Sequence, residues 1–352
     1  MTSARDAAGP DAAPLGWAQV IQSAVGIALA AALVVLGLPW VADTTWPQIL
    51  AQLEGVGPGS AALMAGLLVL GLYCYTYTMT ASLPGLTHLR GLMVNASGSM
   101  VSNVLPGGGA AGVALTFVMF RSYGFARRAI STSIVVLTMW NILARLALPV
   151  LGALAVLLGP VTAPRTVLLA AAVATGIGLL LLGFFAGVIF SDRIAREVGS
   201  TVSSATAPIA RRFPRVSHLD GLIEDHRARV AAIVRSSSIQ LSLGLAGMFG
   251  CLFVLYVVSA RTVGLELGVV ALFAAYAFRQ VLTVIAITPG GLGVTEIGTV
   301  GILVAFGGDP VAASAAAVLY ALFTHLLEVP LGALALVGWW TGRGRRSPPG
   351  GA

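Results

Sequence analysis

The chain has 352 residues, of which 57% are hydrophobic and only 9% are charged, and its mean hydropathy is +0.94. A soluble domain typically has about a quarter of its residues charged, so this composition excludes an ordinary soluble enzyme. All 20 basic residues are arginine, against 13 acidic residues. Without lysine the chain cannot form a Walker A phosphate loop or a lysine Schiff base. A helix crosses a bilayer with about 20 apolar residues, so there is room for roughly six to nine crossings.

Six apolar stretches have the length of full membrane spans. A short tail rich in alanine, proline and aspartate (1–16) precedes them and a basic tail (341–352) follows them, and both tails are expected to be disordered. We expect residues 17–340 to form a single all-α transmembrane domain. The expected spans are 17–38, 60–83, 129–158, 166–190, 239–258 and 311–340.

Two further apolar stretches are interrupted by proline and glycine. Residues 92–120 contain Asn-Val-Leu-Pro-Gly-Gly-Gly at 103–109, and residues 265–306 contain Thr-Pro-Gly-Gly-Leu-Gly at 288–293. Proline cannot continue a helix, and glycine allows tight or left-handed turns. Each stretch is therefore expected to hold two short helices joined at a corner.

The arginines of the short connections predict which side each one faces. Cytoplasmic connections are enriched in arginine and lysine. Connections 84–91 and 121–128 both carry arginine, whereas the linker 39–59 carries none. If both arginine-bearing connections are cytoplasmic, the stretch 92–120 must enter the membrane and return to the same side.

The second interrupted stretch is predicted to enter from the opposite side. The segment 191–235 has eight arginines and the C-terminal tail has three, so both are expected in the cytoplasm. Connections 260–264 and 307–310 carry one arginine and none. The stretch 265–306 then enters and leaves from the outer side. This predicts a multi-pass protein of the cell (inner) membrane with both termini cytoplasmic and re-entrant hairpins at 92–120 and 265–306.

The two corners also correspond in sequence at a constant offset of 183 residues. Pro106-Gly107-Gly108 corresponds to Pro289-Gly290-Gly291, and Arg145 corresponds to Glu328. Paired proline- and glycine-interrupted segments in an inverted repeat indicate a transporter binding site. The helix after each corner would present free N–H groups and a positive dipole end to an anion. The alternative is that both corners only allow close packing.

Four charged residues lie within apolar stretches, where an unpaired charge costs about 2.5–3.5 kcal/mol at the centre of a span. Arg279 lies ten residues before Pro289 and Glu296 seven after it, so the two are expected to pair across the second hairpin. Arg145 and Glu328 are expected to pair between the repeat halves. These pairs either are structural alone or also contact an anionic substrate.

Other chemical interpretations are weaker. The literal GxGxxG at 107–112 lacks the strand and acidic residue of a dinucleotide site. Neither His325 nor the two cysteines have the spacing of a metal site, and we expect no metal and no cofactor. Ser97 with His325 as base would make an intramembrane hydrolase, although small hydroxyl residues also occur in helix packing. The basic segment 191–235 is expected to lie near anionic lipid headgroups.

The two interrupted motifs resemble those of the flippase-like membrane proteins, which are related to the transmembrane region of lysylphosphatidylglycerol synthases. The resemblance rests on Asn103-Val104-Leu105-Pro106-Gly107-Gly108 and on Arg279 followed by Thr288-Pro289-Gly290-Gly291-Leu292-Gly293-Val294-Thr295-Glu296. It covers about residues 17–340. It implies a bacterial inner-membrane protein that moves a lipid between leaflets.

The resemblance and the charges together give the expected function and site. We expect translocation of an anionic phospholipid or lipid-linked headgroup, without enzymatic activity, because the aminoacyl-transferase domain of the bifunctional synthases is not expected here. The expected substrate-binding residues are Asn103, Pro106, Gly107, Gly108, Arg145, Arg279, Pro289, Gly290, Gly291, Gly293, Thr295, Glu296 and Glu328. The rival function is a non-catalytic scaffold for a lipid- or glycan-modifying enzyme. The expected partner is a membrane lipid rather than nucleic acid, and homo-oligomerisation or a lipid-synthesis enzyme partner stays open.

Overall fold

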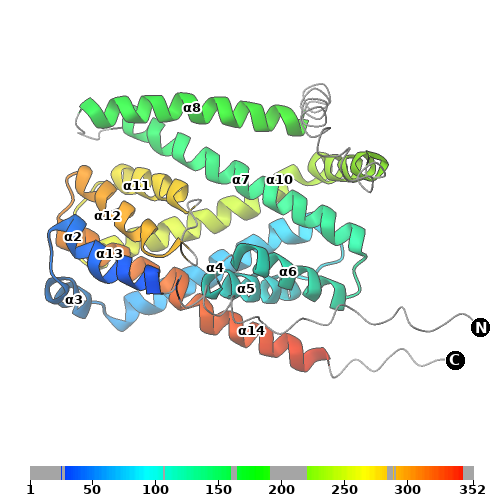
Figure 1. Cartoon of the computed structure of the whole chain (residues 1–352), viewed down its shortest axis with the longest axis horizontal. Coiled ribbons are helices and arrows are strands. Elements are labelled where there is room, and N and C mark those ends of the chain that lie inside the picture. Colours follow the sequence, from blue (N-terminus) through cyan, green and yellow to red (C-terminus); the bar gives the residue numbers. More distant parts are fainter. Residues whose placement is uncertain are drawn as a thin grey trace, which may run out of the picture.

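The computed structural model describes residues 25, 28–105, 108–159, 165–190, 220–283, 288 and 291–343. Every regular element in these ranges is a helix, which confirms the expected all-α class (Figure 1). The N-terminal tail, the C-terminal tail after Arg343 and the Pro-Gly steps 106–107 and 289–290 lie outside the described residues.

Several helices are long and apolar enough to cross a membrane. They are α4 (Pro58–Ser82), α7 (Arg127–Leu158), the part of α10 (Asp220–Thr262) from Arg229 onward, and the stretch 310–342 formed by α13 (Pro310–Ala321), the π-helix η4 (Leu322–Leu326) and α14 (Glu328–Arg343). Their mean hydropathies are 1.5–2.2 over the most apolar 18 residues. Exposed leucines on these helices and the exposed Trp340 on α14 suit contact with lipid. The chain is therefore a multi-pass membrane protein.

Within the described residues, four helices qualify as spans, or five if a bent pair of helices near the N-terminus counts as one, against the six expected from the sequence. The helix α8 (Arg165–Phe190) matches the expected span 166–190, and its stretch 175–184 counts as a shorter apolar helix. Only part of the first expected span, 17–38, is described. The described residues therefore do not establish two of the six expected spans, 17–38 and 166–190.

The linker expected at 39–59 is partly helical. After η1 (Leu33–Gly37) and α2 (Leu38–Ala42), the chain bends by 95° into α3 (Trp46–Glu54). The Thr45 backbone N–H donates to Gln48 Oε1 (2.8 Å), which forms a capping box at the start of α3. The Trp46 indole N–H donates to the Val35 carbonyl (2.7 Å) and ties α3 to η1. The charge and length of the linker do not indicate this helix, whose start depends on the capping pair Thr45 and Gln48.

The helix α10 begins earlier than expected. The basic segment was expected to extend to residue 235, but residues 220–235 already belong to α10, which continues without a break through the span. Residues 191–219 lie outside the described part of the chain. The expected cytoplasmic loop is therefore shorter by sixteen residues.

Each of the two interrupted stretches forms a pair of short helices. The first pair is α5 (His88–Val104) and α6 (Gly108–Ser122), and the second pair is α11 (Val269–Leu282) and α12 (Val294–Ala305). At about 1.5 Å per residue these helices are roughly 18–26 Å long, which is less than the ~30 Å hydrocarbon core. The helices of the first pair run antiparallel, with Gly98 against Gly112 and Ser102 against Gly108.

The two pairs occupy opposite halves of the molecule. Along its long axis, α5 and α6 lie toward one end, and α11 and α12 lie toward the other (Figure 1). The connections before α5 and after α6 lie at the same end as the C-terminus of α14 (Figure 1). The connections before α11 and after α12 lie at the opposite end. The ends of the two pairs therefore lie at opposite ends of the described structure (Figure 1).

The close contact within the first pair gives a test of its packing. A Cβ at Gly112 would lie 2.8 Å from the Gly98 carbonyl oxygen, whereas a Cβ at Gly109 on the same helix meets nothing within 4 Å. We expect Gly112→Ala to destabilise the protein by about 1–3 kcal/mol through overpacking. Gly109→Ala should be neutral or slightly stabilising. Thermal unfolding in mild detergent compares the two variants, and equal melting temperatures would contradict this packing.

Candidate functional site

The two short pairs line one cavity between them. Its volume is about 720 Å³. Its walls come from α5, α6, the end of α11, Thr288 and Gly291 of the second corner, the start of α14 and the flanking helices α4, α7, α10, α13 and η4. Residues of both interrupted stretches therefore meet at one polar space, as the sequence predicted. Its neutral polar wall includes Asn95, Ser102, Asn103, Asn141, Gln280 and Thr283.

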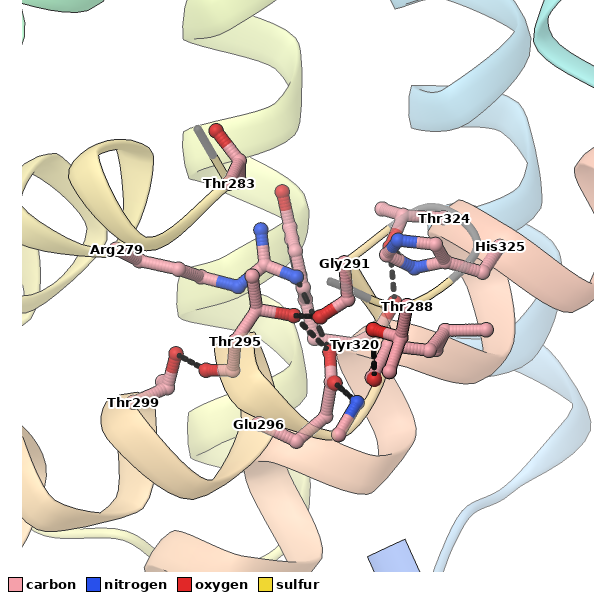
Figure 2. Close-up of polar contacts among 12 residues, drawn as sticks. Arg279, Thr283, Thr288, Gly291, Thr295, Glu296, Thr299, Tyr320, Thr324 and His325 are labelled. Carbon is pink, nitrogen blue, oxygen red and sulfur yellow. Dashed lines mark hydrogen bonds and ion pairs between the residues drawn. The ribbon is translucent and has the colours of Figure 1, made fainter. Parts of the chain in front are cut away.

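The expected ion pair of the second hairpin is present. Arg279 Nη2 lies 3.3 Å from Glu296 Oε1, and the two side chains are only 6% and 2% exposed (Figure 2). The Arg279 guanidinium also lies over the Tyr320 ring, 4.8 Å from its centroid. This contact joins α11, α12 and α13, and it confirms the predicted pairing of Arg279 with Glu296.

Glu296 is held by three donors. Besides Arg279, the backbone N–H of Gly293 donates to Glu296 Oε2 (2.6 Å), and Thr295 Oγ1 lies 2.8 Å from Glu296 Oε1 (Figure 2). Gly293 has a φ of +89°, which favours glycine at this position. The Glu296 carboxylate thus caps the N-terminus of α12. One of the N–H groups that the sequence offered to a substrate anion is already bound by the chain's own carboxylate.

The expected pairing of Arg145 with Glu328 is wrong. Arg145 Nη1 donates to Thr283 Oγ1 (2.5 Å) and to Gln280 Oε1 (3.4 Å), and its guanidinium lies 5.9 Å from the centre of the Phe249 ring. The physical reason is that α7 packs against α11, so Arg145 reaches the C-terminal end of α11. Corresponding positions of a repeat do not have to touch.

Glu328 has a different neutral partner. The Asn103 side-chain amide donates to Glu328 Oε2 (3.0 Å), which joins the start of α14 to the C-terminal end of α5. Among the described residues, no arginine or histidine nitrogen lies within ion-pair distance of this carboxylate. The cavity wall therefore holds a cation and a carboxylate, Arg145 and Glu328, each bonded only to neutral groups.

The corner residues themselves are only partly described. Gly108, at the first turn of α6, is buried where a Cβ would collide with the Ser102 carbonyl oxygen and lie 2.7 Å from the Ser102 Cα atom. Gly291 is buried with a φ of +75° and lines the cavity. Pro106, Gly107, Pro289 and Gly290, which the sequence placed in the site, lie outside the described residues.

Several cavity residues were missed. The Asn141 side chain donates to the Tyr75 hydroxyl (2.8 Å), and both residues line the cavity beside Arg145. Gln280, Thr283 and Tyr320 were also not singled out. A signal existed for Asn141, because it lies four residues before Arg145 and therefore shares its helix face. The contacts of Tyr75 come from a different helix and could not be read from spacing.

The residues of the hydrolase alternative do not meet. The fully buried Ser97 hydroxyl donates to the Gly332 carbonyl (3.4 Å), which places it in the packing of α5 on α14. His325 lines the cavity and contacts Thr324 (3.1 Å between Nδ1 and Oγ1). Ser97 has the packing role that the sequence analysis gave as its alternative.

Comparison with known proteins gives one family. The model of the family described as "Lysylphosphatidylglycerol synthase TM region" matches residues 23–332, which include every cavity residue named above. A search of curated proteins gives no match. The family match supports a membrane protein related to lipid modification or transport.

The buried ion pair gives a test that needs no substrate. Removing one partner of a buried pair leaves an uncompensated charge and typically costs about 3–5 kcal/mol. We expect Arg279→Gln to lower the melting temperature in detergent strongly. The double variant Arg279→Gln with Glu296→Gln should recover part of the loss, because no unpaired charge remains. Arg165→Gln, an exposed control, should change little. If the double variant loses as much stability as the two single variants lose together, the pairing is contradicted.

Proposed function

The chain belongs to the family of the lysylphosphatidylglycerol synthase transmembrane region, and we propose that it moves an anionic phospholipid or lipid-linked headgroup between the leaflets of the cell membrane. The observation that carries this proposal is the cavity between the two short helix pairs, with Arg145 on its wall bonded only to neutral side chains. A headgroup phosphate would supply the negatively charged partner that Arg145 does not have among the described residues of the protein. The proposed activity is transport and not an enzymatic reaction.

The proposed topology has six spans and two re-entrant hairpins in an inverted repeat. The bounds of the helices support it. Adding 183 to the bounds of α6 gives 291–305, which is close to the 294–305 of α12. Adding 183 to the bounds of α7 gives 310–341, which is close to the 310–343 of the last span. Gly124 and Gly307, which correspond at the same offset, end these helices with φ values of +94° and +87°. Both termini are proposed to be cytoplasmic, at the arginine-bearing end.

Arg145 is proposed to bind the phosphate. A guanidinium offers several N–H donors in one plane, and charge-assisted bonds to phosphate are about twice as strong as neutral ones. Two of the Arg145 bonds go to the neutral acceptors Thr283 and Gln280, which an anionic oxygen can replace. Moving Arg145 toward a headgroup would also release the end of α11. Substrate binding and movement of the second hairpin are thereby linked.

Arg279 and the N-terminus of α12 are proposed to hold the structure of the site in place and not to bind the headgroup. Their charges are already balanced by Glu296, which also fixes the turn at Gly293. The N-terminus of α6 at Gly108 has no acidic residue in its first turn and faces the cavity. It is the better place for a second contact to the phosphate. The headgroup would pass through the cavity while the acyl chains remain in the lipid.

Reconstitution into vesicles tests the function. A trace of fluorescent phosphatidylglycerol is followed between leaflets in vesicles with and without the full-length protein. We expect the protein to accelerate movement, and Arg145→Gln to reduce the acceleration by about tenfold or more, because a hydrogen bond to a charged group contributes about 1.5–3 kcal/mol. Arg145→Lys should retain part of the rate, and Arg165→Gln, which removes an exposed arginine outside the cavity, should retain all of it.

The outcome separates transport from scaffolding. Equal movement in empty and protein-containing vesicles would refute translocation. Acceleration that is identical in wild type and Arg145→Gln would refute the assigned role of Arg145 alone. Both proteins must show the same melting temperature within a few degrees before their rates are compared.

A further inference from the structure

The two carboxylates near the cavity differ in their surroundings. Glu296 accepts from an arginine, a backbone N–H and a hydroxyl, and is 2% exposed. Glu328 lines the cavity and accepts one bond, from the neutral Asn103 amide. Several donors stabilise the charged form of a carboxylate, and a carboxylate with one neutral donor lacks most of that stabilisation. Only Glu328 has surroundings that suit both protonation states.

From this juxtaposition of Glu328, Asn103 and the open cavity beside Arg145, we propose that Glu328 is the proton-binding residue that couples headgroup movement to a proton gradient. This inference rests on the proposed transport function and deepens it by naming the energy source. The proton binds to a Glu328 carboxylate oxygen when the cavity faces one side of the membrane and leaves it when the cavity faces the other. No covalent bond of the lipid changes.

The Asn103 amide fits this role. Its NH₂ group donates to the ionised carboxylate, and its carbonyl oxygen can accept from the O–H of the protonated acid after the amide rotates. Asn103 is the second residue from the end of α5, directly before the first corner. If protonation of Glu328 changes its hydrogen bond to Asn103, the end of α5 and with it the first hairpin can shift. In the last span, Glu328 follows the π-helix η4, a kind of irregularity that is frequent at functional sites.

The neighbouring charges explain how proton and headgroup interact. The other titratable groups on the cavity wall are Tyr75 on α4, Arg145 on α7, Arg279 on α11, Tyr320 on α13 and His325 on η4. The part of α5 that faces Glu328 contributes only neutral side chains among the cavity residues.

Arg279 is balanced by Glu296, so Arg145 is the cation left to bind a phosphate. A protonated Glu328 leaves this attraction unopposed, while an ionised Glu328 repels the phosphate. At a separation on the order of 10 Å and an effective dielectric constant of about 20, that repulsion changes binding by on the order of tenfold.

The test uses the full-length protein in vesicles that contain a trace of fluorescent phosphatidylglycerol, with the membrane potential clamped and a difference of one pH unit across the membrane. One proton moving with each monoanionic headgroup predicts a shift of up to about tenfold in the equilibrium ratio of probe between leaflets. In Glu328→Gln, whose amide cannot exchange a proton here, the ratio should not shift with the gradient, whatever the rate at which the probe moves. Glu266→Gln, which removes an exposed carboxylate outside the cavity, should behave as wild type.

A second measurement does not depend on transport. Infrared difference spectra of the purified protein, recorded across a pH titration, should show the carbonyl band of a carboxylic acid that is lost in Glu328→Gln. If Glu328→Gln does not fold, Glu328→Asp is compared instead, and it should keep the response to the gradient.

The outcomes separate the two proposals. Wild-type movement whose equilibrium ignores the pH gradient would overturn proton coupling and leave the transport function standing. A gradient response that persists in Glu328→Gln would overturn the role of Glu328. No protein-dependent movement at all in the wild type would overturn the transport function, and the coupling with it.

Discussion

The architecture depends on one constraint, which is that backbone N–H and C=O groups cannot be left unpaired in lipid. A helix interrupted inside the membrane frees such groups, and they are tolerated only when protein or a wet cavity surrounds them. Both interruptions of this chain meet the constraint in the same way. Gly108 and Gly291 are buried against their own hairpins, and both line the same cavity. The polar space at the centre of the molecule is therefore a consequence of how the two helix pairs end.

The distribution of charge follows from the same arrangement. At the second corner, Glu296 caps α12 and pairs with Arg279, so one carboxylate satisfies a helix end and a buried arginine together. Elsewhere on the cavity wall, Glu328 and Arg145 have only neutral partners among the described residues. The ion pair at the second corner is thus electrostatically complete, whereas Glu328 and Arg145 retain charges that are available to a ligand or a proton.

Much of this could be predicted from the sequence because periodicity, prolines and charged residues are local signals. The long helices α4, α7 and α8 begin and end within two residues of the expected spans, and the Arg279–Glu296 pair followed from two distances along one hairpin. The Arg145–Glu328 pairing failed because it needed the packing of α7 on α11, which no spacing encodes. The helix α3 was missed because its start depends on the capping pair Thr45 and Gln48 rather than on an apolar run. Tyr75 joined the site through a contact between two separate spans.

The central claim, that each short helix pair returns to the side from which it enters, is tested most directly by thiol labelling. Single cysteines at Leu89 and Ala126, beside the two ends of the first pair, and at Glu266 and Asp309, beside the ends of the second, are placed in a background with Cys74 and Cys251 replaced by serine. A membrane-impermeant thiol reagent is added to sealed vesicles of each orientation. The account predicts that the first two positions react from one side only and the second two from the other side only. Labelling of Leu89 and Ala126 from opposite sides, or of Glu266 and Asp309 from opposite sides, would show that the pair crosses the membrane and would contradict the account.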